Sequence, residues 1–287
     1  MNISDWERAG QGLQIEGNSI FCMESGAGSE TIVILHGYPT SSFDFKDVLP
    51  LLAKQYRVIV HDHIGFGLSD KPADYSYSLM EQADRALLVW RALGVERAHL
   101  VAHDYGTSIA TELVARRNMG FEPIKLESLT LCNGSVHIEL AKLRFIQKLL
   151  RNRTLGPLVA QLSSKRIFRK NMRKLWANPS TLPEAEIDAM WELLIRDNGK
   201  DALPRITQYL RERQLFWHRW VGGLKVTNLH THILWGNEDP ITGGAIARIH
   251  HEEMAGSRLT LLEGVGHYPM IEAPERWATA LLSGLAG

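Results

Sequence analysis

Three side chains in this sequence could together carry out nucleophilic catalysis, and each follows a short apolar run. Asp104 lies in VAHDYGTS (101–108), Asp239 ends the stretch GNED, and His267 lies in GVGHYP. An ionised aspartate can attack a carbon atom, a histidine can activate water, and a second acid can orient that histidine. The pattern therefore predicts a triad with Asp104 as nucleophile, His267 as base and Asp239 as the orienting acid.

The turn around Asp104 is expected to join a strand to the N-terminus of a helix. A helix N-terminus stabilises negative charge, which favours an ionised carboxylate there. The small residues Ala102 and Gly106 would let the backbone bend sharply. A turn of this form usually presents a serine, but Thr107 and Ser108 lie a turn into the helix and replace it poorly. The alternative is that Asp104 only caps the helix.

The elements that would position these residues alternate between strand-like and helical runs. Helical periodicity recurs at 79–93, 107–119 and 275–285, and nearly continuous apolar runs are typical of buried parallel strands. After a hairpin at 13–25, strands are expected at 31–37, 57–63, 98–104, 126–134, 231–239 and 258–264. This alternation predicts a doubly wound α/β fold. Residues 135–225 contain helical patterns only, so we expect a core of 1–134 and 226–287 with a helical cap, 135–225, over the strand ends.

The cap sequence is strongly asymmetric in charge. From Lys142 to Lys174 it has eleven lysines or arginines and no acid. Phe168, Met172, Leu175 and Trp176 recur there at helical spacing, which is typical of an apolar stripe packed on a core beneath a solvated basic face. The alternative is a surface, 142–174, that makes peripheral contact with an anionic membrane.

The composition narrows the classes of function further. The 287 residues have a formal net charge of zero, which gives no reason to expect a nucleic-acid partner. No signal peptide or membrane-spanning run is recognisable, and buried free thiols at Cys22 and Cys132 would suit a cytoplasmic location. The glycine-rich loop 62–70 fits no nucleotide motif and is expected to be structural. The pairs His61/His63 and His230/His232 lack acidic or thiol partners at ligand spacing, so neither a cofactor nor a metal is expected.

Several stretches together resemble the α/β-hydrolase superfamily along the whole chain. They are HGYPTSSFDF, DHIGFGLSDKP, HDYG, WGNEDP and GHYPMIEAPE. The aspartate at the turn resembles the branch that holds epoxide hydrolases and haloalkane dehalogenases, and within it the chain is most similar to the mesoderm-specific transcript proteins. The resemblance implies an α/β-hydrolase fold with a mostly parallel eight-stranded sheet, helices on both faces and an inserted helical cap. It also implies an oxyanion hole formed by the backbone N–H groups of Tyr38 and Tyr105.

An aspartate nucleophile in this branch implies a lipophilic small-molecule substrate with a reactive saturated carbon. Epoxide hydrolysis is expected, with Tyr209 as the cap acid and His36 near the substrate or its leaving group. The first cap tyrosine of epoxide hydrolases has no obvious counterpart, and Tyr38, His137 or a water could replace it. Dehalogenation is less favoured, because Tyr105 and Tyr38 occupy the places of the familiar Trp and Asn halide donors. Tryptophans of the cap could supply a replacement donor (Trp176, Trp191, Trp217 and Trp220). Ester or lactone hydrolysis, and a non-catalytic binding or scaffold role, remain alternatives; the sequence leaves the oligomeric state open.

Overall fold

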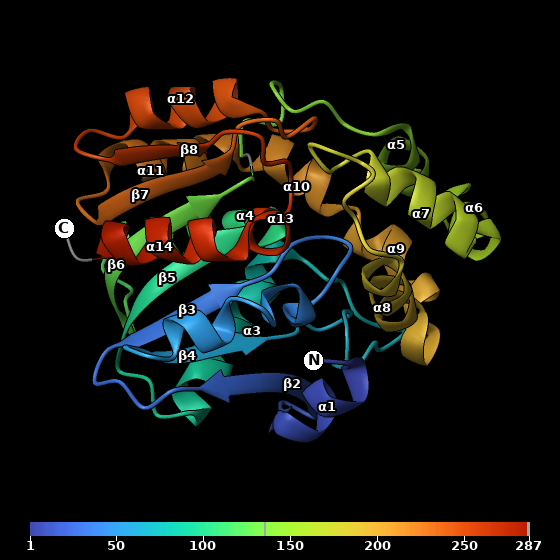
Figure 1. Cartoon of the computed structure of the whole chain (residues 1–287), viewed down its shortest axis with the longest axis horizontal. Coiled ribbons are helices and arrows are strands. Elements are labelled where there is room, and N and C mark those ends of the chain that lie inside the picture. Colours follow the sequence, from blue (N-terminus) through green and yellow to red (C-terminus); the bar gives the residue numbers. More distant parts are fainter. Residues whose placement is uncertain (135, 286–287) are drawn as a thin grey trace.

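The computed structural model describes residues 1–134 and 136–285, and these contain one eight-stranded sheet (Figure 1). The strand order is β1-β2-β4-β3-β5-β6-β7-β8. The β1–β2 and β2–β4 pairs are antiparallel, and every later pair is parallel. The strand bounds are Gln11–Ile15, Asn18–Ser25, Thr31–Leu35, Arg57–His61, Arg97–His103, Lys125–Cys132, His230–Gly236 and Arg258–Leu262. The mostly parallel sheet confirms the predicted fold class.

The central strands are apolar along their length because helices cover both faces of the sheet (Figure 1). In β3, for example, Ile32, Val33, Ile34 and Leu35 are all fully buried. Such strands lose the alternation of polar and apolar residues that a one-sided sheet shows. The helices and 3-10 turns outside the interval between β6 and β7 are α1 Ile3–Ala9, η1 Ser42–Phe45, α2 Leu49–Leu52, α3 Leu79–Ala92, α4 Tyr105–Asn118, α12 Gly244–Glu253, α13 Pro269–Glu272 and α14 Pro274–Leu285.

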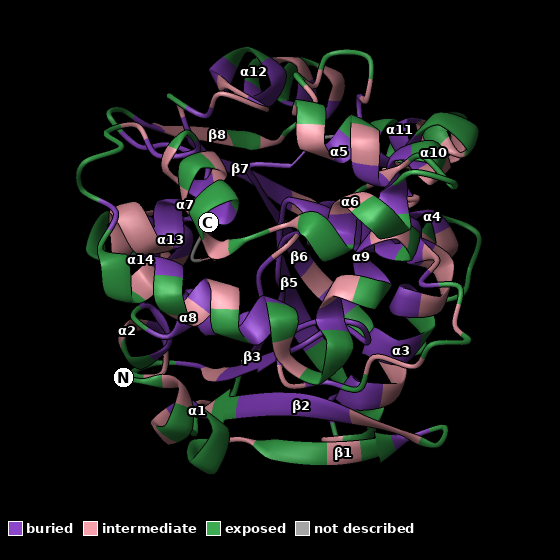
Figure 2. Ribbon diagram, turned by 90° about the vertical axis from the view of Figure 1, so that its right-hand side faces the viewer, coloured by how far each residue is buried: buried purple, intermediate pink, exposed green. Residues whose placement is uncertain are grey.

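The described residues between β6 and β7 form helices and no strand. These elements are α5 Phe145–Leu150, α6 Gly156–Leu162, α7 Lys165–Arg173, α8 Glu184–Ile195, η2 Arg196–Asn198, α9 Gly199–Ile206, α10 Tyr209–Leu215 and α11 Trp217–Val226. Helices α5 to α9 lie beyond the strand ends, toward the viewer in Figure 2, whereas α11 packs against α4 of the core. The division into a core and a separate cap stays a prediction, and its positions 135 and 286–287 lie outside the described residues.

The loop 62–70 lies beside these strand ends and is held there by hydrogen bonds to Asp62. The buried Asp62 carboxylate accepts hydrogen bonds from the backbone N–H groups of Ser42 and Leu68, both at 2.7 Å. This loop therefore has the structural role predicted for it. Within residues 1–134 and 136–285, no helix is long and apolar enough to cross a membrane.

Candidate active site

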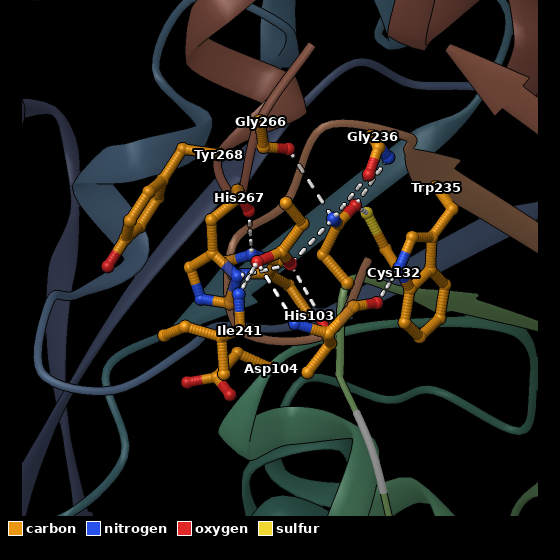
Figure 3. Close-up of polar contacts among 12 residues, drawn as sticks. His103, Asp104, Cys132, Trp235, Gly236, Ile241, Gly266, His267 and Tyr268 are labelled. Carbon is orange, nitrogen blue, oxygen red and sulfur yellow. Dashed lines mark hydrogen bonds and ion pairs between the residues drawn. The ribbon is translucent and has the colours of Figure 1, made fainter. Parts of the chain in front are cut away.

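The predicted site residues come together because their strands end at one edge of the sheet. Tyr38 follows β3, Asp104 follows β5, Asp239 follows β7 and His267 follows β8. These strands run parallel, so their carboxyl ends meet along that edge. Asp104, His267 and Tyr38 line the same pocket, and Figure 3 shows the imidazole of His267 close to the Asp104 carboxylate.

Asp104 occupies a sharp turn with an uncommon backbone conformation. Its φ is 42° and its ψ is −104°, and α4 begins at the next residue. L-residues rarely adopt a positive φ, so the surrounding packing must hold the turn in place. A side chain at Gly106 would meet the carbonyl oxygen of Leu35 at 2.5 Å, and one at Gly37 would meet the imidazole of His103 at 2.7 Å. The two glycines therefore let the turn pack tightly against the end of β3.

Two groups from different parts of the chain hold Asp104. The backbone N–H of Tyr38 donates to Oδ2 of its carboxylate at 3.0 Å. The guanidinium of Arg213, a residue of α10 that is only 2% exposed, donates to the backbone carbonyl of Asp104 at 3.0 Å. Arg213 also donates to the hydroxyl of Ser108 at 2.7 Å. One carboxylate oxygen thus receives a backbone hydrogen bond, while α10 fixes the turn itself.

Asp239 and His267 form a buried pair. Nδ1 of His267 lies 2.7 Å from Oδ2 of Asp239. The same oxygen accepts from the amide of Asn133 at 2.9 Å and from the hydroxyl of Thr242 at 2.5 Å. With these partners Asp239 must point at the ring, so Nδ1 donates its hydrogen and Nε2 is left for other chemistry.

The opposite charges of Asp239 and His267 lower the pKa of the carboxyl group and raise the pKa of the imidazole, so that both groups are ionised. Burial alone would raise the pKa of Asp239, but the contact with His267 and the donors around it lower the pKa to about 2. Burial would lower the pKa of His267, but the Asp239 carboxylate, aided by Asp104, raises the pKa to about 9. The resting site therefore favours an ionised Asp239 beside a protonated His267 at neutral pH.

A largely apolar pocket leads from the candidate catalytic residues into the helical interval. It holds about 830 Å³ of empty space, with its open mouth included. Phe168, Met172 and Leu175 line it, so this part of the predicted stripe faces the pocket. The polar side chains of the wall are few, namely those of Tyr38, Asp104, Arg144, Gln147, Ser163, Asn171 and His267. Such a pocket suits a lipophilic molecule with a small number of polar atoms.

The two predicted leaving-group residues lie outside the lining of this pocket. Tyr209 is buried behind it, and the phenol accepts from the amide of Gln147 at 3.3 Å. The expectation that His36 contacts the substrate is corrected, because both nitrogens of its ring have hydrogen-bond partners within the protein. Nε2 accepts from the backbone N–H of His63 at 3.0 Å, and Nδ1 lies 2.8 Å from the carbonyl of Gly37. His36 is thus a structural residue, buried and neutral, with its pKa lowered to about 3 mainly by burial.

Tyr38 is the tyrosine that lines the pocket. Its phenol is 3.1 Å from the hydroxyl of Thr207, which itself donates to the carbonyl of Leu203 at 2.6 Å. Because the Thr207 hydroxyl hydrogen is donated to Leu203, the Tyr38 phenol is the donor in the hydrogen bond between Tyr38 and Thr207. Burial raises the pKa of Tyr38 to about 12, so the phenol keeps its proton at neutral pH.

The other side chains that were considered for leaving-group contact are mostly committed elsewhere. Of the four tryptophans, Trp191 alone lines the pocket, where its ring packs on Phe168. Trp220 donates its indole N–H to Glu112 at 2.8 Å, and His137 contacts Glu139 and Glu253. The backbone N–H of Tyr105 lies at the first residue of α4, and its place in the oxyanion hole stays a prediction.

The histidine pairs of the strands serve the packing of the sheet. The His61 and His63 rings meet edge to face at 5.1 Å, His230 bonds to the carbonyl of Gly284, and His232 bonds to Thr260. In the part of the chain that the structure describes, no three His, Cys, Asp or Glu side chains are placed to hold a metal ion.

Two supporting residues escaped the sequence analysis. Asn133 was not among the predicted site residues, yet its amide donates hydrogen bonds both to Asp239 and to the carbonyl of Gly236. Its place directly after β6, between the strands of Asp104 and Asp239, was the available signal. Arg213 had a weaker signal: it lies four residues after Tyr209 in a helix, and its guanidinium stacks over that ring at 4.7 Å.

Comparison with known proteins agrees with this architecture. The family model described as alpha/beta hydrolase fold matches residues 30–274. The chain belongs to the α/β-hydrolase fold family. This α/β hydrolase is 37% identical to LipZ of Mycobacterium tuberculosis over 282 residues, which covers 98% of the chain and 97% of LipZ. The resemblance to the mesoderm-specific transcript proteins is confirmed by the Mus musculus protein, 32% identical over 98% of the chain and 87% of that protein.

Among solved structures, the haloalkane dehalogenase DbeA of Bradyrhizobium elkanii superposes with a TM-score of 0.82. The superposition covers 97% of both chains at 22% sequence identity. At that identity the similarity establishes the fold alone, so the reaction of this α/β hydrolase must be argued from its own side chains.

Proposed function

We propose that the protein hydrolyses epoxides to diols through a covalent ester on Asp104. The observation that carries this proposal is the placement of Tyr38. Its backbone N–H holds Oδ2 of Asp104, while Tyr38, whose phenol is protonated, belongs to the lining of the same apolar pocket. Once the phenol hydrogen turns from the Thr207 hydroxyl toward a bound molecule, a nucleophile and an acid are available to one substrate in the same pocket.

In the first step, the Oδ1 oxygen of Asp104 attacks a ring carbon of the epoxide. A C–O ester bond forms, the ring C–O bond breaks, and its electron pair passes to the ring oxygen. That oxygen takes the proton of the Tyr38 phenol, because an alkoxide is a poor leaving group without a proton. The Oδ2 oxygen, which becomes the ester carbonyl, already lies against the N–H of Tyr38.

In the second step, His267, which loses its resting proton to solvent once the Asp104 charge is gone and regains one when that charge returns, removes a proton from water, which attacks the carboxyl carbon of the Asp104 ester. The N–H of Tyr38 stabilises the oxyanion on the former Oδ2 atom. The ester C–O bond then breaks, and His267 returns its proton to the departing diol oxygen. The carboxylic acid left on Asp104 ionises, and its proton restores the Tyr38 phenol. The net reaction is epoxide plus water giving diol.

The competing reactions fit the pocket less well. A carboxylate that attacks an ordinary ester forms an anhydride, which readily reverses. A halide needs N–H donors at the leaving group, but the residue after the nucleophile is Tyr105 rather than a tryptophan, which leaves Trp191 as the indole in the lining of the pocket. An epoxide needs a proton donor instead, and Tyr38 supplies one.

The test compares two leaving groups in single-turnover alkylation of Asp104, with styrene oxide and with a bromoalkane. Tyr38→Phe keeps the backbone N–H but removes the acid, so epoxide opening should slow by roughly 10²–10⁴-fold, as for loss of a general acid. The bromoalkane rate should barely change, because a halide leaves without a proton. Tyr209→Phe is the matched control and should have the smaller effect, since its phenol lies behind Gln147.

The opposite pattern would replace the proposal by dehalogenation. Wild-type protein would then react faster with the bromoalkane, and Tyr38→Phe would leave the epoxide rate unchanged. A larger loss in Tyr209→Phe than in Tyr38→Phe would move the role of acid back to Tyr209.

A further inference from the structure

The surface formed by α5, α6 and α7, residues 142–174, combines free positive charge with exposed apolar side chains. Of its eleven cations, Lys165, Arg169 and Arg173 pair with acids of α8. Among the described residues, the other eight make no ion pair; they are Lys142, Arg144, Lys148, Arg151, Arg153, Arg166, Lys170 and Lys174. Since the whole chain is neutral, this basic cap surface is a local concentration of charge.

Large apolar side chains protrude from the same surface. Phe145 is 74% exposed, Leu162 68% and Leu158 58%, and Leu155 and Ile167 are also exposed. Scattered single apolar residues are ordinary on a protein surface, but five within 23 positions, interleaved with free cations, are not. Helices α5, α6 and α7 lie at the right-hand edge of Figure 1 and on the side toward the viewer in Figure 2.

The mouth of the catalytic pocket opens on this surface. A shallow hollow between α5 and α7 shares Arg144, Ile146, Ile167 and Asn171 with the pocket wall. Its remaining lining includes Lys142, Lys174 and the exposed Phe145. A molecule that enters the pocket through this hollow therefore crosses a rim of cations and apolar groups.

We propose that the basic cap surface docks on an anionic lipid bilayer, so that lipophilic substrates pass from the bilayer into the pocket. Protruding leucines and a phenylalanine among cations suit the boundary between acyl chains and anionic headgroups. A nucleic acid or an acidic protein would bind the cations but gives the leucines of α6 no comparable environment. The docking is independent of the reaction, whereas the passage of substrate rests on the proposed epoxide hydrolysis.

The test is sedimentation of the full chain with vesicles of phosphatidylcholine alone and of phosphatidylcholine with phosphatidylglycerol. Wild-type protein should bind the anionic vesicles at about 0.05 M salt and be released at about 0.5 M, where screening is strong. Asp104→Ala should bind equally well, which separates docking from catalysis. Absence of wild-type binding at low salt would overturn the proposal.

Two variants test the surface itself without touching the pocket wall. Each cation near an anionic bilayer strengthens binding roughly five-fold, so the triple variant Lys148→Gln/Arg153→Gln/Arg166→Gln should bind about 100-fold more weakly. Its matched control, Lys54→Gln/Arg91→Gln/Arg248→Gln, removes three exposed cations outside residues 142–174 and should bind like wild type. Leu158→Ser/Leu162→Ser should lose about ten-fold, because the apolar contact is gone. Equal loss in the cationic variant and its control would refute a localised docking surface, and full binding by the leucine variant would refute apolar insertion.

Discussion

His267 faces two carboxylates in the resting enzyme, and their charges decide its protonation. Burial opposes a charged ring, but Asp239 and then Asp104 raise the pKa of His267 to about 9. A protonated imidazole cannot take a proton from water. Formation of the ester on Asp104 removes one of the two negative charges, so the pKa of His267 should fall when a base is needed. The nucleophile would thereby switch on the base of the second step.

This coupling predicts a difference between two pH titrations. In the free enzyme, the imidazole NMR signal of His267 should titrate with a pKa of about 9. Hydrolysis of the preformed ester should be slow at low pH, where the base is protonated, and should rise to a plateau with an apparent pKa clearly below that of the free enzyme. Equal values in the two titrations would mean that Asp104 does not influence the base.

At the scale of elements, most of the sheet could be predicted, because strands that are buried on both faces consist almost entirely of apolar residues and can be recognised by that composition. The helix predicted at 107–119 instead begins at Tyr105, because the positive φ of Asp104 turns the chain within one residue. Sequence position did not reveal that α10 lies outside the lining of the pocket. Tyr209 therefore appeared to be the cap acid, while Arg213 of the same helix, which reaches the nucleophile turn, was missed.

Helix α10 connects the helical interval to the nucleophile through Arg213, and this contact can be tested. Arg213→Lys keeps the charge but loses the planar fork that reaches both Ser108 and the carbonyl of Asp104. Misplacement of the carboxylate by about an ångström should slow alkylation roughly 100-fold, while substrate affinity changes little. Rapid-mixing measurements of the alkylation rate over a range of substrate concentrations separate these two effects.

The matched control for this prediction is Arg211→Lys, two residues earlier in α10. Arg211 is exposed, so its replacement should leave both alkylation and affinity unchanged. Alkylation at the wild-type rate in Arg213→Lys would show that the turn keeps its geometry without the fork.

At the scale of the whole molecule, the fold positions the site residues, and a few side chains determine which reaction they carry out. The sheet places Asp104, Asp239 and His267 at one edge, and the helices after β6 provide a basic outer surface over an apolar pocket. A dehalogenase superposes on this chain with a TM-score of 0.82, so the backbone alone does not distinguish the leaving group. That distinction depends on the side chains that meet the leaving group, among which Tyr38 is the proposed proton donor.

The covalent ester on Asp104 is the central claim, and His267→Gln tests it most directly. This variant should still be alkylated by styrene oxide, but the ester should persist because the base that activates water is missing. Peptide mass spectrometry after mixing should find the peptide that contains Asp104 heavier by the mass of one epoxide, in stoichiometric amount and without steady-state diol release. Diol production at the wild-type rate, with the Asp104 peptide unmodified throughout, would contradict the mechanism.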